Sequence, residues 1–339
     1  MGSSLTELGI PASLQHASTV RRLDDTTYEA NLNPAFCVIA VPNGGYVASI
    51  FLQVAKAHMT PRGQPDTIAV HWQFLSRTSH GRGVLKVDEV KMGRAMSVLH
   101  ITLHQVDLVP SHPWVAPESR DRGQVVAYVT NRNMDDEAGV SFQTGWTVQP
   151  SPPPPIDFSK VRLGQDPHWA RMQTFLMRQL PMLHNLEYYV PRAAKPLLPA
   201  ATMDLWIRLA NEADGRFVAT SLGYVADAAA PLIVENYRQP RSDGPFPADS
   251  FPRNKGFWFP TVSMGLDVRK RLPPEGVEWL RLRIATKAIL NGRYDAEQVV
   301  FDDKGDLIAT CHHVAMVVDV ARNTAGRGQA ADRSHKGKI

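Results

Sequence analysis

One acidic residue of this 339-residue chain stands where a carboxylate could act on a substrate. Asp227 follows Gly223 and Tyr224 and falls in the first turn or two of a largely apolar predicted helix. There the helix N-terminus would stabilise the charged carboxylate, whereas desolvation would disfavour it. A carboxylate held in this balance can act as a general base or orient a water molecule. We therefore expect Asp227 to be the centre of a catalytic site; the simpler alternative is an exposed helix acid or a cap.

Two neighbouring histidines lie on the last strand pattern of the chain, over residues 307–318. Side chains alternate between the two faces of a strand, so only one of the two can point at a given site. If Cys311 faces the core, His313 faces it as well and His312 faces away. A histidine titrates near neutral pH and can act as an acid or a base. The alternative is a pair of partly buried strand histidines that take no part in chemistry.

Other catalytic arrangements find no support in the sequence. The only two cysteines, Cys37 and Cys311, make a cysteine-based zinc site very unfavourable. His100 and His104 share a strand face but have no third ligand, so we expect no metal. The sequence contains no Gly-x-Ser-x-Gly motif of a serine hydrolase, and we expect no cofactor.

Two glycine-led helices are predicted to position these residues. Asn43 can cap a helix that begins at Gly44-Gly45 and continues at apolar helical spacing to about His58. The second helix runs from about Tyr224 to residue 237, and Pro231 inside it predicts a kink or an early break. Backbone N–H groups at either helix start could polarise a carbonyl group.

A run of strand patterns follows each helix. The patterns cover residues 68–75, 84–91, 95–105 and 123–129, and then 262–270, 279–289, 294–301 and 307–318. Tight turns are predicted at Gly93-Arg94 and Gly292-Arg293. One apolar helix wrapped by a curved antiparallel sheet is an α+β arrangement, which we expect in each half of the chain.

The two halves of the chain are similar, which indicates an internal duplication. The segment from Gly45 to Ser49 matches the segment from Gly223 to Asp227, and the later matches keep the same order. Because Ser49 occupies the position of Asp227, only the second copy carries an ionisable group there. Two such units could join edge to edge, which would remove two exposed sheet edges. We expect units at 20–148 and 166–321, a Pro-rich linker at 149–165 and a disordered basic tail at 322–339.

The net charge of +4 belongs entirely to the predicted tail. Residues 322–339 contain five basic residues and one acidic residue, and the rest of the chain balances 32 against 32. We therefore expect no nucleic-acid partner. No apolar run approaches the roughly 20 residues that cross a bilayer, and no secretion signal is present. We expect a cytoplasmic protein with no membrane span, and a homo-oligomer is compatible with the sequence.

Glycine-led helices followed by strand runs, present twice, resemble the double hot-dog fold. The chain resembles in particular the type II acyl-CoA thioesterase family, in its fungal thioesterase-like branch. Residues 42–57, 68–105, 221–235 and 261–318 carry the resemblance. That family holds a water molecule with an acid on the second helix, a Thr on the following strand and a Gln on the last strand. The resemblance implies Asp227, Thr261 and His313 as the catalytic set, with His313 departing from the family's Gln.

The activity that this resemblance implies is hydrolysis of an acyl-CoA or acyl-carrier thioester. A thiolate leaves readily, so such a reaction needs no strong general acid. The candidate substrate-binding residues are Gly44, Gly45, Tyr46, Gly223, Tyr224, His71, Arg94 and Arg293, the arginines as partners of the CoA phosphates. Two alternatives stay open. One is a lyase, isomerase or cyclase that acts on a polyketide-like intermediate with an Asp/His pair, and the other is a non-catalytic acyl-binding module.

Overall fold

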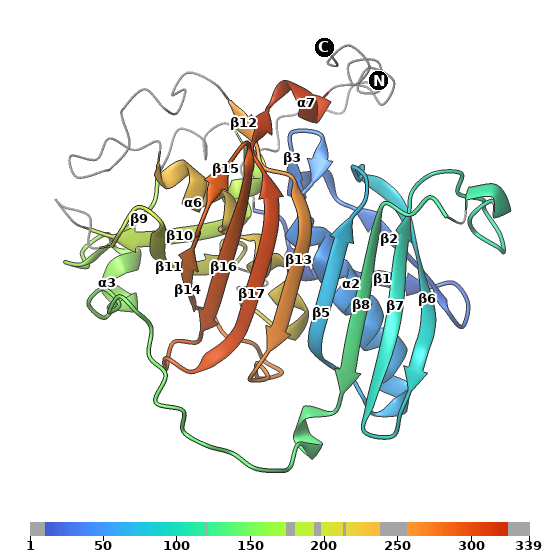
Figure 1. Cartoon of the computed structure of the whole chain (residues 1–339), viewed down its shortest axis with the longest axis horizontal. Coiled ribbons are helices and arrows are strands. Elements are labelled where there is room, and N and C mark those ends of the chain that lie inside the picture. Colours follow the sequence, from blue (N-terminus) through green and yellow to red (C-terminus); the bar gives the residue numbers. More distant parts are fainter. Residues whose placement is uncertain are drawn as a thin grey trace.

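The computed structural model describes residues 11–119, 121–173, 180–192, 198–212, 215–237 and 256–324 (Figure 1). The helices are α1 (Leu14–Ala17), α2 (Gly44–Met59), α3 (Phe158–Arg162), α5 (Leu222–Asp227), α6 (Ala230–Asn236) and α7 (Ala321–Thr324). Short 3-10 helices lie at Pro34–Phe36, Thr60–Arg62, Pro117–Ser119, Met134–Asp136, Pro181–Asn185 and Ala219–Ser221.

Most strands form one large antiparallel sheet. The first half supplies β1 (Val20–Arg22), β2 (Thr27–Leu32), β5 (Asp66–Phe74), β6 (Gly81–Met92), β7 (Met96–His104) and β8 (Val125–Arg132). The second half supplies β9 (Trp169–Arg171), β10 (Leu186–Pro191), β11 (Thr202–Leu209), β13 (Thr261–Val268), β14 (Leu280–Ala285), β15 (Ile289–Leu290), β16 (Arg293–Phe301) and β17 (Leu307–Met316). Two small ribbons pair β3 (Cys37–Val38) with β4 (Val41–Pro42), and β12 (Phe257–Trp258) with β18 (Val318–Asp319).

The strand order repeats on the two sides of the β5–β13 pair, which lies in the middle of Figure 1. Moving outward, the order is β5, β8, β7, β6, β2, β1 on one side and β13, β17, β16, β14, β11, β10 on the other. At the centre of this repeat His71 lies opposite Gly265. The predicted edge-to-edge joining is confirmed, and it leaves the inner edge of each half paired.

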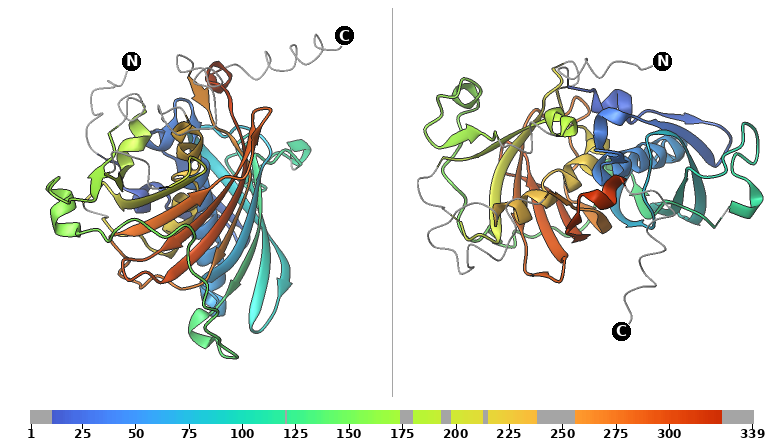
Figure 2. Two further views of the ribbon diagram at one scale, coloured as in Figure 1. Left: turned by 60° about the vertical axis from the view of Figure 1, so that its left-hand side comes forward. Right: turned by 90° about the horizontal axis from the view of Figure 1, so that it is seen from above.

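The central helices lie on the concave side of the curved sheet (Figure 2). Helix α2 begins as predicted, because the Asn43 side-chain oxygen accepts a hydrogen bond from the Tyr46 N–H at 3.0 Å. The second helix is broken between α5 and α6, and Pro231 lies in the first turn of α6, where its missing N–H costs nothing. Both helices are buried among apolar side chains of the sheet.

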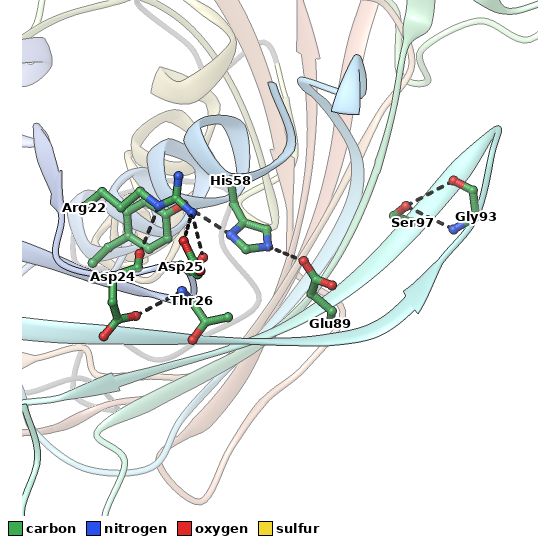
Figure 3. A network of polar contacts seen from close by, with 9 residues as sticks. Arg22, Asp24, Asp25, Thr26, His58, Glu89, Gly93 and Ser97 are labelled. Carbon is green, nitrogen blue, oxygen red and sulfur yellow. Dashed lines mark hydrogen bonds and ion pairs between the residues drawn. The ribbon is translucent and has the colours of Figure 1, made fainter. Parts of the chain in front are cut away.

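The C-terminal end of α2 is fixed to the first half of the sheet by a polar network (Figure 3). The His58 ring lies between Glu89 of β6, at 3.0 Å from Nε2, and the Tyr28 hydroxyl of β2, at 3.2 Å from Nδ1. The turn beside it is closed by Arg22, which donates to the Asp25 carboxylate at 2.8 Å. Helix α2 is therefore held at both of its ends.

Several expected elements differ from the structure. The strand pattern over 279–289 is divided into β14 and β15, because the N–H groups of Lys287 and Ala288 bond to the Asp295 carboxylate instead of a neighbouring strand. The pattern over 307–318 ends at Met316, after which β18 leaves the sheet to pair with β12. The sheet also extends through β1, β2 and β9 to β11, strands to which we assigned no residue ranges.

The expected linker and tail are only partly described. The side chain of Phe158 packs against Trp206 and Trp279, so the end of the Pro-rich segment covers the outer face of the second half of the sheet. Residues 322–324 belong to α7 and not to a disordered tail, and Asn323 is buried. Residues 325–339 lie outside the described residues. The proposed unit boundaries stay predictions.

No helix in the described part of the chain is long and apolar enough to cross a membrane.

Candidate active site

Asp227 is the last residue of α5, and its side chain is only 6% exposed. Because α5 has only six residues, fewer than two turns, Asp227 lies where we expected it within its own helix. The helix N-terminus that it meets is that of α2, in the other half of the chain: Oδ2 accepts hydrogen bonds from the Gly45 N–H at 2.9 Å and from Asn43 Nδ2 at 3.0 Å. These two donors, at the N-terminus of α2, fix the orientation of the carboxylate.

The second carboxylate oxygen of Asp227 faces the two other predicted residues. Thr261, the first residue of β13, donates its hydroxyl to Oδ1 at 3.2 Å. His313 Nε2 lies 3.5 Å from Oδ1, within ion-pair range but too far for a good hydrogen bond. Its ring is fully buried, and neither ring nitrogen has a hydrogen-bond partner within the described residues. The structure thus brings Asp227, Thr261 and His313 together.

Asp227 and Thr261 line a cavity of about 290 Å³, whereas His313 does not. The cavity walls are mostly apolar, and their aromatic members are Phe74, Tyr188, Tyr224, Phe257, Trp258 and Phe259. Burial raises the pKa of the Tyr188 and Tyr224 hydroxyls, and the charge of Asp227 adds to both shifts. The site is therefore a hydrogen-bonded carboxylate in the wall of an apolar space, which suits an acyl group better than a polar ligand.

The first half of the chain has no equivalent of this site. Ser49, the counterpart of Asp227, accepts the Tyr224 N–H at 2.9 Å where α2 crosses α5. His313 lies opposite Met264, and the residue in the corresponding place of the first half is Val129, opposite Val70. The duplicated scaffold therefore carries its carboxylate and its imidazole in the second half only.

Helix-start residues that we expected to bind substrate have different surroundings. Gly44 lines the cavity, but the Gly45 N–H is already bonded to Asp227. Gly223 is at the helix crossing, where a Cβ atom would lie 2.5 Å from Ser49 N, so the position has no room for a ligand. The Tyr46 hydroxyl is buried away from the cavity, between Asn33 and Ala17.

The remaining predicted binding residues lie outside the cavity. His71 is exposed on the outer face of the sheet. Arg94 is exposed in the β6–β7 turn, where its carbonyl accepts a hydrogen bond from Gln64 beyond the C-terminal end of α2. Since a helix of 16 residues is about 24 Å long, that turn is far from Asp227. Arg293 is exposed at the start of β16 and does not line the cavity either.

Two residues of the site were missed by sequence reasoning. Asn43 was expected only as a cap, yet its amide nitrogen also holds Asp227. Arg77 lines the cavity directly after β5 and donates to the carbonyls of Arg322 and Asn323, at 2.9 and 3.0 Å. A basic residue just beyond a strand end was the only sequence signal for Arg77.

Two sequence families match this chain. The acyl-CoA thioesterase N-terminal domain matches residues 32–117, and the acyl-CoA thioesterase C-terminal domain matches residues 153–317. A relative from Talaromyces wortmannii, the thioesterase-like protein TwmA, is 36% identical over 96% of this chain and 98% of its own length. The chain belongs to the acyl-CoA thioesterase family.

Solved structures confirm the hot-dog fold. The acyl-CoA thioesterase II TesB2 from Mycobacterium marinum aligns with a TM-score of 0.58 at 14% identity, over 91% of this chain and all of its own. A hot-dog protein of unknown function from Alicyclobacillus acidocaldarius aligns with a TM-score of 0.61 at 18% identity, over 91% of this chain and 99% of its own. The expected resemblance to type II acyl-CoA thioesterases and the double hot-dog architecture are thus confirmed.

Proposed function

We propose that this thioesterase-family protein hydrolyses acyl thioesters, carried on CoA or on an acyl-carrier protein, to a free acid and a thiol. The observation that carries the proposal is the Asp227 carboxylate. It is fixed by Gly45, Asn43 and Thr261 and lies in the wall of an apolar cavity. A carboxylate positioned in this way can take a proton from a water molecule beside it.

In the proposed reaction, a water molecule bound between Asp227 and Thr261 attacks the thioester carbonyl carbon. Asp227 accepts the proton of the water as the new C–O bond forms, and the carbonyl oxygen becomes an oxyanion. The Gly44 N–H suits this oxyanion, because it lies at the free N-terminus of α2 and its residue lines the cavity. Collapse of the tetrahedral intermediate then breaks the C–S bond, and the sulfur leaves as a thiolate. The proton held by Asp227 passes to the thiolate, which yields the thiol and restores the carboxylate.

His313 acts in this proposal as a positioning residue. Its ring is buried behind Asp227, away from the cavity, with Nε2 directed at Oδ1. From there it can restrict the orientation of the carboxylate, but it does not meet the substrate. This placement favours hydrolysis over the alternative lyase, isomerase or cyclase, in which a histidine would itself exchange a proton with the substrate.

The test uses the purified full-length chain with acyl-CoAs of graded chain length. We expect thiol release, measured with a thiol reagent, and a free acid by mass spectrometry. Asp227→Asn is expected to lower kcat/KM by about 10² to 10⁴. Asp267→Asn is the matched control, since Asp267 is an exposed acid on the outer face of β13.

Each other outcome points to a different function. A product that has lost water, or has an unchanged mass, would favour a lyase, isomerase or cyclase. Binding that survives both Asp227→Asn and His313→Ala, with no turnover, would indicate an acyl-binding module. Thiol release that never exceeds the enzyme-free blank at any chain length would refute the proposed hydrolysis.

A further inference from the structure

Two tyrosines occupy the same position in the two copies of the central helix, and their hydroxyl groups have different surroundings. Tyr46 follows Gly45 in α2, and Tyr224 follows Gly223 in α5. The Tyr46 hydroxyl accepts a hydrogen bond from the Asn33 N–H at 2.9 Å and donates one to the Ala17 carbonyl at 2.6 Å. In the first half, therefore, the backbone of the protein fully satisfies this hydroxyl.

The Tyr224 hydroxyl has no hydrogen-bond partner within the described part of the chain. The residue is 1% exposed, and its ring packs edge-on against Phe36 and lines the cavity beside Asp227. The neighbouring cavity residue Tyr188 shows the usual arrangement, because its hydroxyl donates to the Ala228 carbonyl at 2.9 Å. Buried tyrosine hydroxyls generally have such a partner, so the unpaired one at Tyr224 requires an explanation.

The position of Tyr224 relative to Asp227 indicates where a ligand would meet it. The two residues are three positions apart on α5, so their Cα atoms are about one turn, or about 4.5 Å along the axis, apart. Both residues line the same cavity, together with Tyr188. A ligand in this cavity can therefore contact the carboxylate and the tyrosine side chain at the same time.

We infer that the Tyr224 hydroxyl donates a hydrogen bond to an oxygen on the third carbon of the acyl chain. The preferred substrates are then 3-hydroxyacyl or 3-oxoacyl thioesters and not plain saturated ones. This inference rests on the proposed function for the identity of the ligand. The thioester carbonyl itself is the poorer candidate for this hydrogen bond, because the Gly44 N–H already suits it. A site built to hydrogen-bond a substrate oxygen discriminates against the analogue that lacks it.

The experiment compares two substrates of equal length, 3-hydroxydecanoyl-CoA and decanoyl-CoA, as the ratio of their kcat/KM values. We expect the wild-type ratio to favour the hydroxylated substrate about tenfold to a hundredfold. Tyr224→Phe should bring the ratio close to one. It should not lower the melting temperature, since no hydrogen bond within the protein is lost.

Tyr46→Phe is the matched control, because it removes the same atom from the corresponding position. It loses two hydrogen bonds to the backbone, so its melting temperature should fall while its substrate ratio stays that of the wild type. Should this control fail to fold, the wild-type ratio and the Tyr224→Phe ratio still decide the matter.

Three results would overturn the inference. One is a wild-type ratio near one, and another is an equal loss on both substrates in Tyr224→Phe, which would assign the hydroxyl to the thioester carbonyl. The third is a fall in melting temperature in Tyr224→Phe as large as in Tyr46→Phe, which would reveal a partner within the protein. Calorimetric binding of both thioesters to Asp227→Asn separates this inference from the proposed function. Preferential binding of the hydroxylated thioester without wild-type turnover would refute hydrolysis and keep the role of Tyr224.

Discussion

The crossing of α2 and α5 leaves no room for a side chain at Gly223, and the consequence can be measured. A Cβ atom at this position would lie 2.5 Å from Ser49 N and 2.7 Å from the Ala48 carbonyl carbon, whereas ordinary contacts begin at 3.4 Å. The helices would have to separate by about 0.9 Å, the difference between 3.4 and 2.5 Å, because backbone atoms cannot rotate away. Such overpacking costs about 1 to 3 kcal/mol, and the helix propensity of alanine returns at most about 1 kcal/mol.

Gly223→Ala should therefore lower the free energy of unfolding by about 2 kcal/mol. This value takes about 3 kcal/mol for the overpacking and subtracts about 1 kcal/mol for the better helix propensity of alanine. Gly44→Ala is the comparison, since its Cβ would meet only side-chain atoms, Asp227 Oδ2 at 3.1 Å and Phe74 Cζ at 3.3 Å. That variant should stay within about 1 kcal/mol of the wild type in stability. Its thiol-release activity should nevertheless fall at least about tenfold, because the new methyl group stands beside the carboxylate.

Urea denaturation of the two variants measures the first effect, and thiol release from an acyl-CoA measures the second. The expected pattern is a crossed one, with one variant destabilised and the other folded but impaired. If Gly223→Ala proved as stable as Gly44→Ala, the helix crossing would be looser than described and the close approach would not explain the glycine.

Three further predictions concern residues around the site and the core. Burial lowers the pKa of His104 to about 4, so its ring is neutral in the folded chain and takes up a proton on unfolding below about pH 6.5. Stability present above pH 6.5 is lost as the pH falls toward 4. Between pH 7 and pH 5 the free energy of unfolding should therefore drop by about 2 kcal/mol in the wild type and by less in His104→Gln. Urea denaturation at the two pH values measures this drop, and an equal drop in both proteins would contradict the prediction. Asn43→Asp keeps the helix cap but places a second carboxylate about 3.0 Å from Asp227. Repulsion between the two carboxylates should displace the Asp227 side chain and lower kcat/KM at pH 7 at least about tenfold, and unchanged activity would argue against Asp227 as the base. Asn323→Ala removes the hydrogen bonds to Ala40 and Val38 that fix the β3–β4 ribbon beside the cavity. We expect a higher KM and a lower melting temperature, with little change in kcat. A loss confined to kcat would contradict this prediction.

The general architecture could be predicted because its signals are local or repeated. Asn43 before two glycines marks a helix start, and the second copy of the Gly-Tyr-Val-Ala segment reveals the duplication. Strand parity placed the two histidines on opposite faces, as the structure has them, since His313 is buried and His312 is exposed. The family resemblance, and not parity, selected His313. The same parity would have excluded His71, because its neighbours Val70 and Trp72 face the core.

What could not be predicted depends on how elements distant in the sequence meet. The Asn43 amide reaches Asp227 across 184 positions, and only the crossing of α2 and α5 sets that distance. The Gly45 N–H is likewise used by a side chain from the other half, so no pattern within the first half could show that it is occupied. The break between β14 and β15 has a local cause that the apolar pattern does not show, because the Asp295 carboxylate lies only 7 or 8 positions away on the next strand.

The contact between the start of α2 and the end of α5 also restricts how such a protein can change. In an assembly of two identical subunits, every substitution occurs twice, so a carboxylate gained at one helix end is gained at both. Here the two copies lie on one chain and can differ, which permits serine at position 49 and aspartate at position 227. The serine now supports the backbone of the opposite helix, and the aspartate depends on that helix in return. If one half were replaced by a copy of the other, the chain would therefore lose either the Ser49 hydrogen bond to Tyr224 or the Asp227 hydrogen bond to Gly45.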